Sequence, residues 1–382
     1  MPTKPRGRDL GLPFEGQTGK FNAITDVAGV QVGYTTLIEG EGPLHVGRGP
    51  IRTGVTAILP RGKAPKPSPI WAGQFSFNGN GEMTGIHWIH EAGYFISPII
   101  ITNTHSVGMA HHAAVGWMVR QYRDFFQADH GWAMPVIAET YDGFTNDICG
   151  RHVKEDHVLH ALDTAASGPV GEGNVGGGTG MMTYEFKGGT GTASRLVAID
   201  SQKYTVGVLV QSNFGRREDF SVLGVPVGRF MPEHATLKEM RTPETGSIIV
   251  LIGTDLPLRP SQLRRIAKRA AIGIGRTGTP GGHYSGDLFL AFSTANRIEL
   301  PGMLQFQPPT YGHTYLNDHH LDGVYQATVQ AVEEAVINAM LAAESVTTIK
   351  PPGYSFQAID HERLREIMRR HRRLLESNEV GA

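Results

Sequence analysis

A glycine and a serine stand directly before a run of branched apolar residues in the stretch TPETGSIIVLIGTD, residues 242–255. Ile248 to Ile252 predict a short buried strand, because the run is β-branched, is too short for a helix and is closed by Gly253-Thr254-Asp255. A hydroxyl at the first position of such a strand is held rigidly beside the preceding peptide bond. It can attack the carbonyl of Gly246, so that the peptide becomes an ester and water then releases a new N-terminal Ser247.

The Gly246-Ser247 pair suits this self-cleavage for two physical reasons. Glycine tolerates strained backbone angles and leaves the face of its carbonyl uncovered. The freed α-amine of Ser247 titrates near neutral pH and can act as the base for the same hydroxyl, which is the arrangement of an N-terminal nucleophile. A Gly-Ser pair before a strand is also an ordinary turn, so the dipeptide alone leaves both interpretations open.

The composition argues against nucleic-acid-binding and membrane proteins. The chain has 382 residues, of which 40% are hydrophobic, and a net charge of −1, so no global field attracts nucleic acid or anionic lipid. We expect no membrane span and no signal peptide, because apolar runs of about 18 residues are missing and no apolar segment follows the basic N-terminus. Cys149 is the single cysteine, which predicts a reducing, cytoplasmic location and a small buried or half-buried side chain.

Motifs for nucleotides and metals are incomplete. Residues 171–176 and 273–278 both match G-x-G-x-x-G, but the first follows a loop and the second follows a helix. A dinucleotide site needs this motif between a strand and a helix. His111 and His112 diverge by about 100° on a helix and cannot chelate together, and no HExxH motif occurs. We therefore expect no cofactor and no metal.

Short strands and separated helices must position any site in this chain. Strands are expected at 23–25, 30–34, 54–59, within 94–108, and at 134–143, 195–200, 204–213, 248–252 and 286–296. Helices are expected after residue 108, with Val115, Met118, Val119, Tyr122 and Phe126 on one face, and at about 153–166, 259–271, 324–344 and 363–373. Residues 300–322 predict a long surface loop. No linker divides the chain, so we predict one α/β domain in layers, with sheets in the middle and helices outside.

Long stretches of the sequence match one enzyme family in order. They are RDLGLPFEG, NAITDVAGVQVG, FNGNGEMTG, ITNTHSVGMAHHA, AETYDG, the glycine-rich residues 167–195, GSIIV and SGDLFLAFSTAN. Through them the chain closely resembles the L-aminopeptidase D-amidase/D-esterase (DmpA-type) family, which is related to the β-peptidyl aminopeptidases. The resemblance implies an αββα sandwich, similar in layering to N-terminal nucleophile hydrolases but with different connectivity. It also implies one catalytic domain, 1–382, that cleaves itself into an α chain of 1–246 and a β chain of 247–382, forms homo-oligomers and uses no cofactor.

The same resemblance implies catalytic roles for five residues. Ser247 matches the nucleophile, Ser285 would relay protons, and Asp287 would orient Ser285. Some relatives carry Glu at the acidic position, so the shorter side chain of Asp287 leaves its distance to Ser285 open. Asn213 and Tyr141 match the donors to the oxyanion of the tetrahedral intermediate. Each has an ordinary alternative, since Asn213 can cap a turn, Tyr141 can belong to the core, and Ser285 and Asp287 can flank a turn.

Glu139 suits the α-ammonium of the substrate. It stands two residues before Tyr141 and therefore on the same face of an extended strand. A buried carboxylate that is left unpaired is costly, which predicts weak binding of substrates without a free amine. His283 and Tyr284 are not part of the family pattern and are expected to reshape the pocket.

These observations predict a self-processing serine aminopeptidase. The resemblance implies short peptides, amides and esters as substrates, with small L-residues, D-residues and β-amino acids as the candidate N-terminal groups. An acyltransferase of similar self-cleaving architecture is the alternative enzyme. A glycine-rich nucleotide-binding module is the alternative without catalysis.

Overall fold

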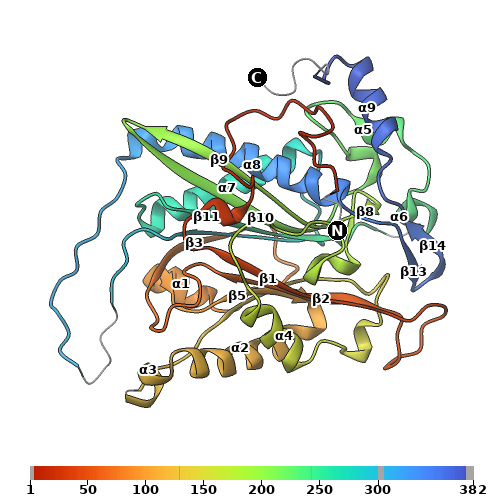
Figure 1. Ribbon diagram of the computed structural model, residues 1–382. Coiled ribbons are helices and arrows are strands. Elements are labelled where there is room, and N and C mark those ends of the chain that lie inside the picture. The colour runs from red at the N-terminus through yellow and green to blue at the C-terminus, as the bar shows by residue number, and fades with distance from the viewer. Residues whose placement is uncertain (1–3, 129, 242, 300–304, 376–382) are drawn as a thin grey trace.

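Two large β-sheets lie face to face in the part of the chain that the structure describes, and helices cover the outer face of each (Figure 1). The computed structural model describes residues 4–128, 130–241, 243–299 and 305–375. The order of layers is helix, sheet, sheet, helix, which confirms the predicted αββα sandwich.

The first sheet has the strand order β1-β2-β5-β6, and its bounds are β1 Gln31–Glu39, β2 Ile51–Leu59, β5 Ile99–Asn103 and β6 Val136–Thr140. β5 and β6 run parallel, and the other neighbours are antiparallel. Helices α2 (Val107–Gln121) and α4 (Glu155–Asp163) cover its outer face. A parallel pair needs a crossover connection, and α2 lies in the connection between β5 and β6.

The second sheet has the order β4-β3-β12-β11-β10-β9, with bounds β4 Tyr94–Phe95, β3 Ile70–Ser76, β12 Gly286–Ser293, β11 Ser247–Thr254, β10 Gln202–Asn213 and β9 Gly189–Ile199. β11 and β12 are parallel and are joined through helix α7, Pro260–Arg276. Helices α7 and α8 (Leu321–Leu341) cover the outer face of this sheet (Figure 1).

Shorter elements complete the fold at its edges. They are α1 Ile86–Ala92, α3 Arg123–Ala128, β7 Met182–Thr183, β8 Phe186–Lys187, α5 Val227–Phe230, α6 Thr236–Glu239, β13 Val346–Ile349, β14 Pro352–Phe356 and α9 His361–Arg370. 3-10 helices span Ile24–Asp26, Thr104–Ser106, Ile148–Gly150, Gly176–Gly180, Arg217–Asp219 and Asp318–His320.

Strand β11 is buried on both faces, which explains its continuous apolar sequence. Ile249 and Leu251 pack between the two sheets, whereas Ile248, Val250 and Ile252 pack against the layer of α7 and α8. Successive side chains of a strand point to opposite faces, so every residue of this run meets apolar neighbours. The predicted strand at 248–252 is therefore confirmed, and it extends from Ser247 to Thr254.

Several local predictions were wrong. Residues 24–26 form a 3-10 helix instead of a strand. The buried face of α2 contains Ala110, Ala113, Ala114, Trp117 and Met118, while Val119 is exposed. Met118 and Tyr122 of the predicted face are buried, but Val115 is only half-buried, because small alanines and Trp117 form most of the side that faces the sheet. The helix also ends at Tyr122, whose φ of −108° and ψ of 41° break the helical period before Phe126.

The expectations for Cys149, the second glycine motif, the long loop and a membrane span have different outcomes. Cys149 is exposed, because the neighbouring Ile148 takes the buried side of this short 3-10 helix. The second G-x-G-x-x-G match begins inside α7, so it cannot open a helix. In the described part of the predicted loop, residues 305–317 form neither helix nor strand, and residues 300–304 lie outside the described residues. None of the helices in the described ranges has the length and apolarity that a membrane crossing requires.

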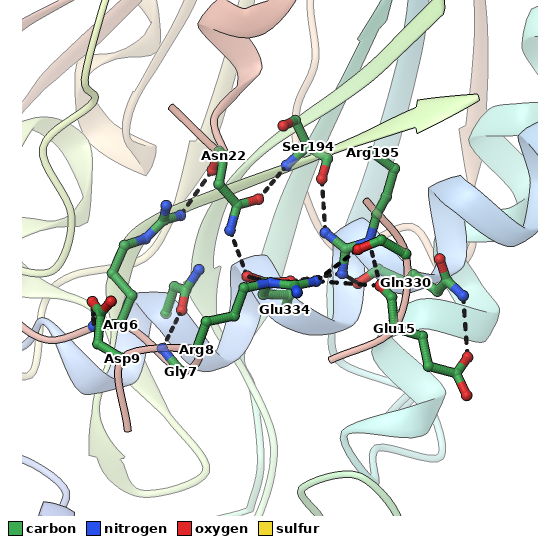
Figure 2. Close-up of polar contacts among 12 residues, drawn as sticks. Arg6, Gly7, Arg8, Asp9, Glu15, Asn22, Ser194, Arg195, Gln330 and Glu334 are labelled. Atoms are coloured by element: carbon green, nitrogen blue, oxygen red, sulfur yellow. Dashed lines mark hydrogen bonds and ion pairs between the residues drawn. The ribbon is translucent and has the colours of Figure 1, made fainter. Parts of the chain in front are cut away.

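The N-terminal segment is bonded to α8 by a buried charge network (Figure 2). Glu334 of α8 is fully buried, and its Oε2 lies 2.6 Å from Nη2 of Arg195 in β9. Arg8 and Asn22 bond the other oxygen, at 3.1 and 2.6 Å. Burial by itself raises the pKa of Glu334, but the two guanidinium groups outweigh it and hold the pKa below its usual value. The network therefore keeps Glu334 charged inside the protein.

Replacement of Glu334 by Ala is expected to lower the free energy of unfolding by about 3–5 kcal/mol, because Arg195 is left buried without its counter-charge. Urea titration at pH 7 measures the difference. The matched control is Glu366→Ala, which removes an exposed partner of Arg370 on α9 and should cost less than about 0.5 kcal/mol. Equal losses in the two variants would contradict the prediction.

Candidate active site

Ser247 is the first residue of β11 and lies between the ends of two neighbouring strands. Its partner across the antiparallel pair is Asn213, the last residue of β10, and its partner across the parallel pair is Gly286, the first residue of β12. The Ser247 hydroxyl donates to the carbonyl oxygen of Gly246 at 2.8 Å and accepts from the N–H of Gly286 at 3.2 Å. Strand pairing thus fixes the hydroxyl beside its own preceding peptide bond.

Gly246 approaches the end of β10 too closely for any side chain. A Cβ at this position would lie 2.3 Å from the carbonyl oxygen of Asn213 and 2.6 Å from Cα of Phe214. The Gly246 carbonyl also accepts from the N–H of Gly286 at 3.2 Å. Packing therefore requires glycine here, whatever chemistry follows.

Ser285 and Asp287 flank Gly286 and bond to one another. The Ser285 hydroxyl donates to Oδ1 of Asp287 at 2.6 Å, and both side chains are almost fully buried. The short aspartate side chain therefore does reach Ser285. Burial raises the pKa of Asp287 to about 6, although the hydrogen bonds from Ser285 and Asn78 act in the opposite direction.

Asn78 forms two hydrogen bonds with Asp287 and was not predicted from the sequence as a site residue. Its Oδ1 accepts from the Asp287 N–H at 2.5 Å, and its Nδ2 donates to Asp287 Oδ2 at 2.8 Å and to the Gly282 carbonyl at 3.1 Å. Asn78 stands 209 residues before Asp287. The available signal was its position in FNGNGEMTG, which was read only as part of the family resemblance.

Asn213 and Tyr141 come together where the two sheets meet. The Asn213 side-chain oxygen accepts from the Met182 N–H at 2.8 Å, and its Nδ2 donates to the Tyr141 carbonyl at 3.0 Å. These two bonds fix which way the amide points, and they use one of its two N–H groups. The Tyr141 ring lies beside Phe144, with centroids 6.3 Å apart, and burial raises the pKa of its hydroxyl. Met182 belongs to the glycine-rich residues 167–195, and its bond to Asn213 joins them to the end of β10.

Glu139 is buried in β6 and is already bonded on both oxygens. Oε1 accepts from the Glu82 N–H at 3.0 Å, and Oε2 accepts from the Thr104 hydroxyl. Burial raises the pKa of Glu139, while these hydrogen bonds and the nearby His105 lower it. Thr104 was not predicted as a site residue.

Residues 78–84, which we call the bridging segment, connect the two sheets at the site. The N–H of Asn80 donates to the Ser285 carbonyl at 3.2 Å, next to β12. The N–H of Glu82 binds Glu139, and the N–H of Thr84 donates to the Ile137 carbonyl at 2.9 Å, both in β6. One short segment thus joins Glu139 of the first sheet to the Ser285 side of the second.

Comparisons with known proteins identify the family of this chain. The profile of peptidase family S58 matches residues 22–351. The chain belongs to peptidase family S58. It is 50% identical over 382 residues to the β-peptidyl aminopeptidase BapA of Sphingosinicella microcystinivorans, with 97% of this chain and 93% of the relative covered. The predicted family is therefore confirmed.

Solved structures of proteins with similar sequences have the same fold. The L-aminopeptidase D-Ala-esterase/amidase of Ochrobactrum anthropi, described as a prototype of the serine aminopeptidases and a variant of the Ntn hydrolase fold, is 55% identical with a TM-score of 0.91. The match covers 97% of this chain and 100% of that chain. A β-aminopeptidase of Burkholderia sp. is 44% identical with a TM-score of 0.86, over 96% and 99% of the two chains. This S58 chain is a hydrolase of the aminopeptidase type, and the acyltransferase alternative is not favoured.

His283 and Tyr284 lie at the rim of the site in this S58 peptidase. Their rings meet edge to face with centroids 4.8 Å apart, and Tyr284 is 56% exposed. The Asn80 side chain holds the Tyr284 carbonyl at 2.7 Å. Within the described residues, no group of three or more His, Cys, Asp and Glu side chains is placed to hold a metal ion.

Because Asn78 forms two hydrogen bonds with buried Asp287, we expect its replacement to destabilise the protein. In Asn78→Ala, one carboxylate oxygen and one N–H of Asp287 lose their partner, so unfolding should be easier by about 2–3 kcal/mol. Asn80→Ala is the control, because its exposed amide bonds only a rim carbonyl, and it should cost less than about 1 kcal/mol. Both variants also carry Ser247→Ala, so that the predicted cleavage cannot affect the urea titration. An Asn78→Ala protein as stable as the control would refute this role.

Proposed function

We propose that this chain is a self-processing serine aminopeptidase whose nucleophile is Ser247. The observation that carries the proposal is the Ser247 hydroxyl, 2.8 Å from the carbonyl oxygen of the residue that it would attack. A bond forms between Oγ and the Gly246 carbonyl carbon, the carbon–nitrogen bond breaks, and the hydroxyl proton passes to the departing Ser247 amine. Water then hydrolyses the ester, which leaves a Gly246 carboxylate and a free Ser247 amine. The products are an α chain, 1–246, and a β chain, 247–382.

Turnover uses the freed amine of Ser247 as the base for its own hydroxyl. Ser285 relays protons, and its hydrogen bond to the Asp287 carboxylate orients it. Asn213 and Tyr141 donate to the oxyanion of the tetrahedral intermediate, where loss of one such donor costs about 3–4 kcal/mol in other enzymes. The acyl group of the substrate passes to Ser247, the amine or alcohol leaves, and water releases the amino acid.

Glu139 receives the α-ammonium of the substrate in this proposal. Its carboxylate is buried, and a cation is the natural counter-charge for it. The substrates are short peptides, amides and esters with a free N-terminal amine, and the candidate N-terminal groups are small L-residues, D-residues and β-amino acids. The names of the relatives support this range, since they include an L-aminopeptidase D-Ala-esterase/amidase and β-aminopeptidases.

We also propose a homo-oligomer of αβ pairs and a cytoplasmic location. The family resemblance supports the oligomer, and the single cysteine supports a reducing compartment. Light scattering of the purified protein tests the first, and cell fractionation of the source organism tests the second.

Replacement of Ser247 by Ala is expected to abolish both reactions, because no other atom takes the place of Oγ. The parent protein should give two bands on denaturing electrophoresis, the smaller beginning Ser-Ile-Ile-Val, whereas the variant gives one full-length band. Hydrolysis of alanine amide should fall by at least about 1,000-fold. Ser261→Ala, at an exposed position of α7, is the control and should behave as the parent. Cleavage of Ser247→Ala at the same bond would sink the proposal.

Glu139→Gln is expected to remove the preference for a free amine. The loss of the buried counter-charge should lower kcat/KM for alanine amide by about 100-fold, within the range for a disrupted charge pair. Hydrolysis of N-acetylalanine amide, which has no ammonium group, should not fall. Glu82→Gln is the matched control, because that exposed carboxylate neighbours Glu139 but only its backbone N–H binds it. An equal loss of activity on both substrates would show that Glu139 does not bind the α-ammonium of the substrate.

A further inference from the structure

The chain just before Ser247 is a short connection between two anchored elements. Helix α6 is held by the buried carboxylate of Glu185, which accepts from the N–H groups of Leu237 and Lys238 at 2.7 and 3.2 Å. Ser247 is held in β11. Residues 243–246 lie directly before Ser247 and would form the end of the α chain in a cleaved protein.

Glu244 fastens this connection to the site. Its Oε1 accepts from the N–H of Gly246 at 3.0 Å and from the N–H of Gly215 at 3.2 Å. Gly215 follows the end of β10, two residues after Asn213. A single carboxylate oxygen therefore ties the residue whose carbonyl is attacked to the strand that carries the predicted oxyanion donor.

The second oxygen of Glu244 faces the turn that leads to Ser285. A Cβ added at Gly282 would lie 2.2 Å from Oε2 of Glu244, so the carboxylate packs directly against the backbone of this turn. The Gly282 carbonyl in turn accepts a hydrogen bond from the Asn78 side chain, which also donates to the Asp287 carboxylate. The Glu244 carboxylate thus lies between the end of β10 and the turn before β12.

These contacts immobilise Gly246 at both of its ends. Glu244 holds its N–H, while the N–H of Gly286 and the Ser247 hydroxyl hold its carbonyl oxygen. A reacting carbonyl that is fixed beside its nucleophile reacts faster, because less freedom has to be lost on the way to the transition state. We propose that Glu244 is a positioning residue for self-cleavage and has no part in substrate turnover. This inference rests on the proposed self-cleavage of the chain.

Charge explains why the contact would not outlast cleavage. Glu244 already acts on the pKa of Asp287, which burial raises and the nearby Glu244 charge raises further. Hydrolysis adds a new carboxylate at Gly246, two residues from Glu244 and beside the same buried aspartate. Like charges at short range disfavour this arrangement, so we expect the new carboxylate to leave its place beside Ser247 after cleavage.

The test compares the rates of self-cleavage of three variants. Each protein is made by cell-free synthesis, and the loss of the full-length band is followed over time by denaturing electrophoresis. Glu244→Ala should slow cleavage by at least tenfold, whereas Glu244→Gln should slow it less, because the amide oxygen accepts from the same two N–H groups. Glu239→Ala removes an exposed carboxylate of α6 from the same stretch of chain and should match the parent. After cleavage is complete, turnover of alanine amide per Ser247 N-terminus should agree within twofold between Glu244→Ala and the parent.

Different results overturn different claims. If the parent cleaves and Glu244→Ala cleaves as fast, the role of Glu244 is wrong and the proposed function stands. If the parent stays intact, or Ser247→Ala is cleaved, the proposed function itself fails. A tenfold loss of turnover in fully cleaved Glu244→Ala would refute a role confined to self-cleavage. A large fall in melting temperature on adding Glu244→Ala to Ser247→Ala would assign the slow cleavage to a damaged fold, which also overturns the inference.

Discussion

The site depends on the register of β11 between an antiparallel and a parallel neighbour. This register sets Ser247 beside Asn213 on one side and Gly286 on the other. A slip by one residue would turn every side chain of β11 to the opposite face. Such a slip would place between the two sheets the side chains that now face α7 and α8, and it would turn Ser247 away from its partners. Apolar side chains fill both faces of β11, so the glycines at its two ends select the alignment. A Cβ in the place of Gly246 would lie 2.3 Å from the Asn213 carbonyl oxygen, and one in the place of Gly253 would lie 2.9 Å from the Phe292 ring.

Polar groups at the strand ends are buried, and the bridging segment supplies many of their partners. The Asn78 side chain donates an N–H to the Asp287 carboxylate and accepts from the Asp287 backbone N–H, and the Glu82 N–H donates to the Glu139 carboxylate. A buried carboxylate without partners would favour its neutral form or destabilise the fold. With these partners both carboxylates are buried at one end of the two sheets. The segment thus makes a charged site compatible with a closed core.

The sequence predicted best where periodicity was strong and local. β11 was found because its short, continuous apolar run matches burial on both faces, and α8 was found because its apolar pattern is long. The face of α2 was partly wrong because small alanines, which give a weak apolar signal, form much of its buried side. Cys149 was wrong because one residue in a turn carries no periodic signal. Asn78 could not be found, since its bond to Asp287 joins residues 209 positions apart. The roles of the residues that match the family pattern stay predictions, although the structure brings those residues to one end of the two sheets.

The position of the predicted cut explains how the fold could survive it. The Gly246–Ser247 bond lies where β11 begins, so its hydrolysis removes no strand from the second sheet. The β chain would keep β11 and β12 in the middle of that sheet, paired with β10 and β3 of the α chain. Glu334 of the β chain would remain bonded to Arg8 and Arg195 of the α chain. The two chains would then be held by strand pairing and by a buried charge network, and neither depends on the peptide bond that is lost.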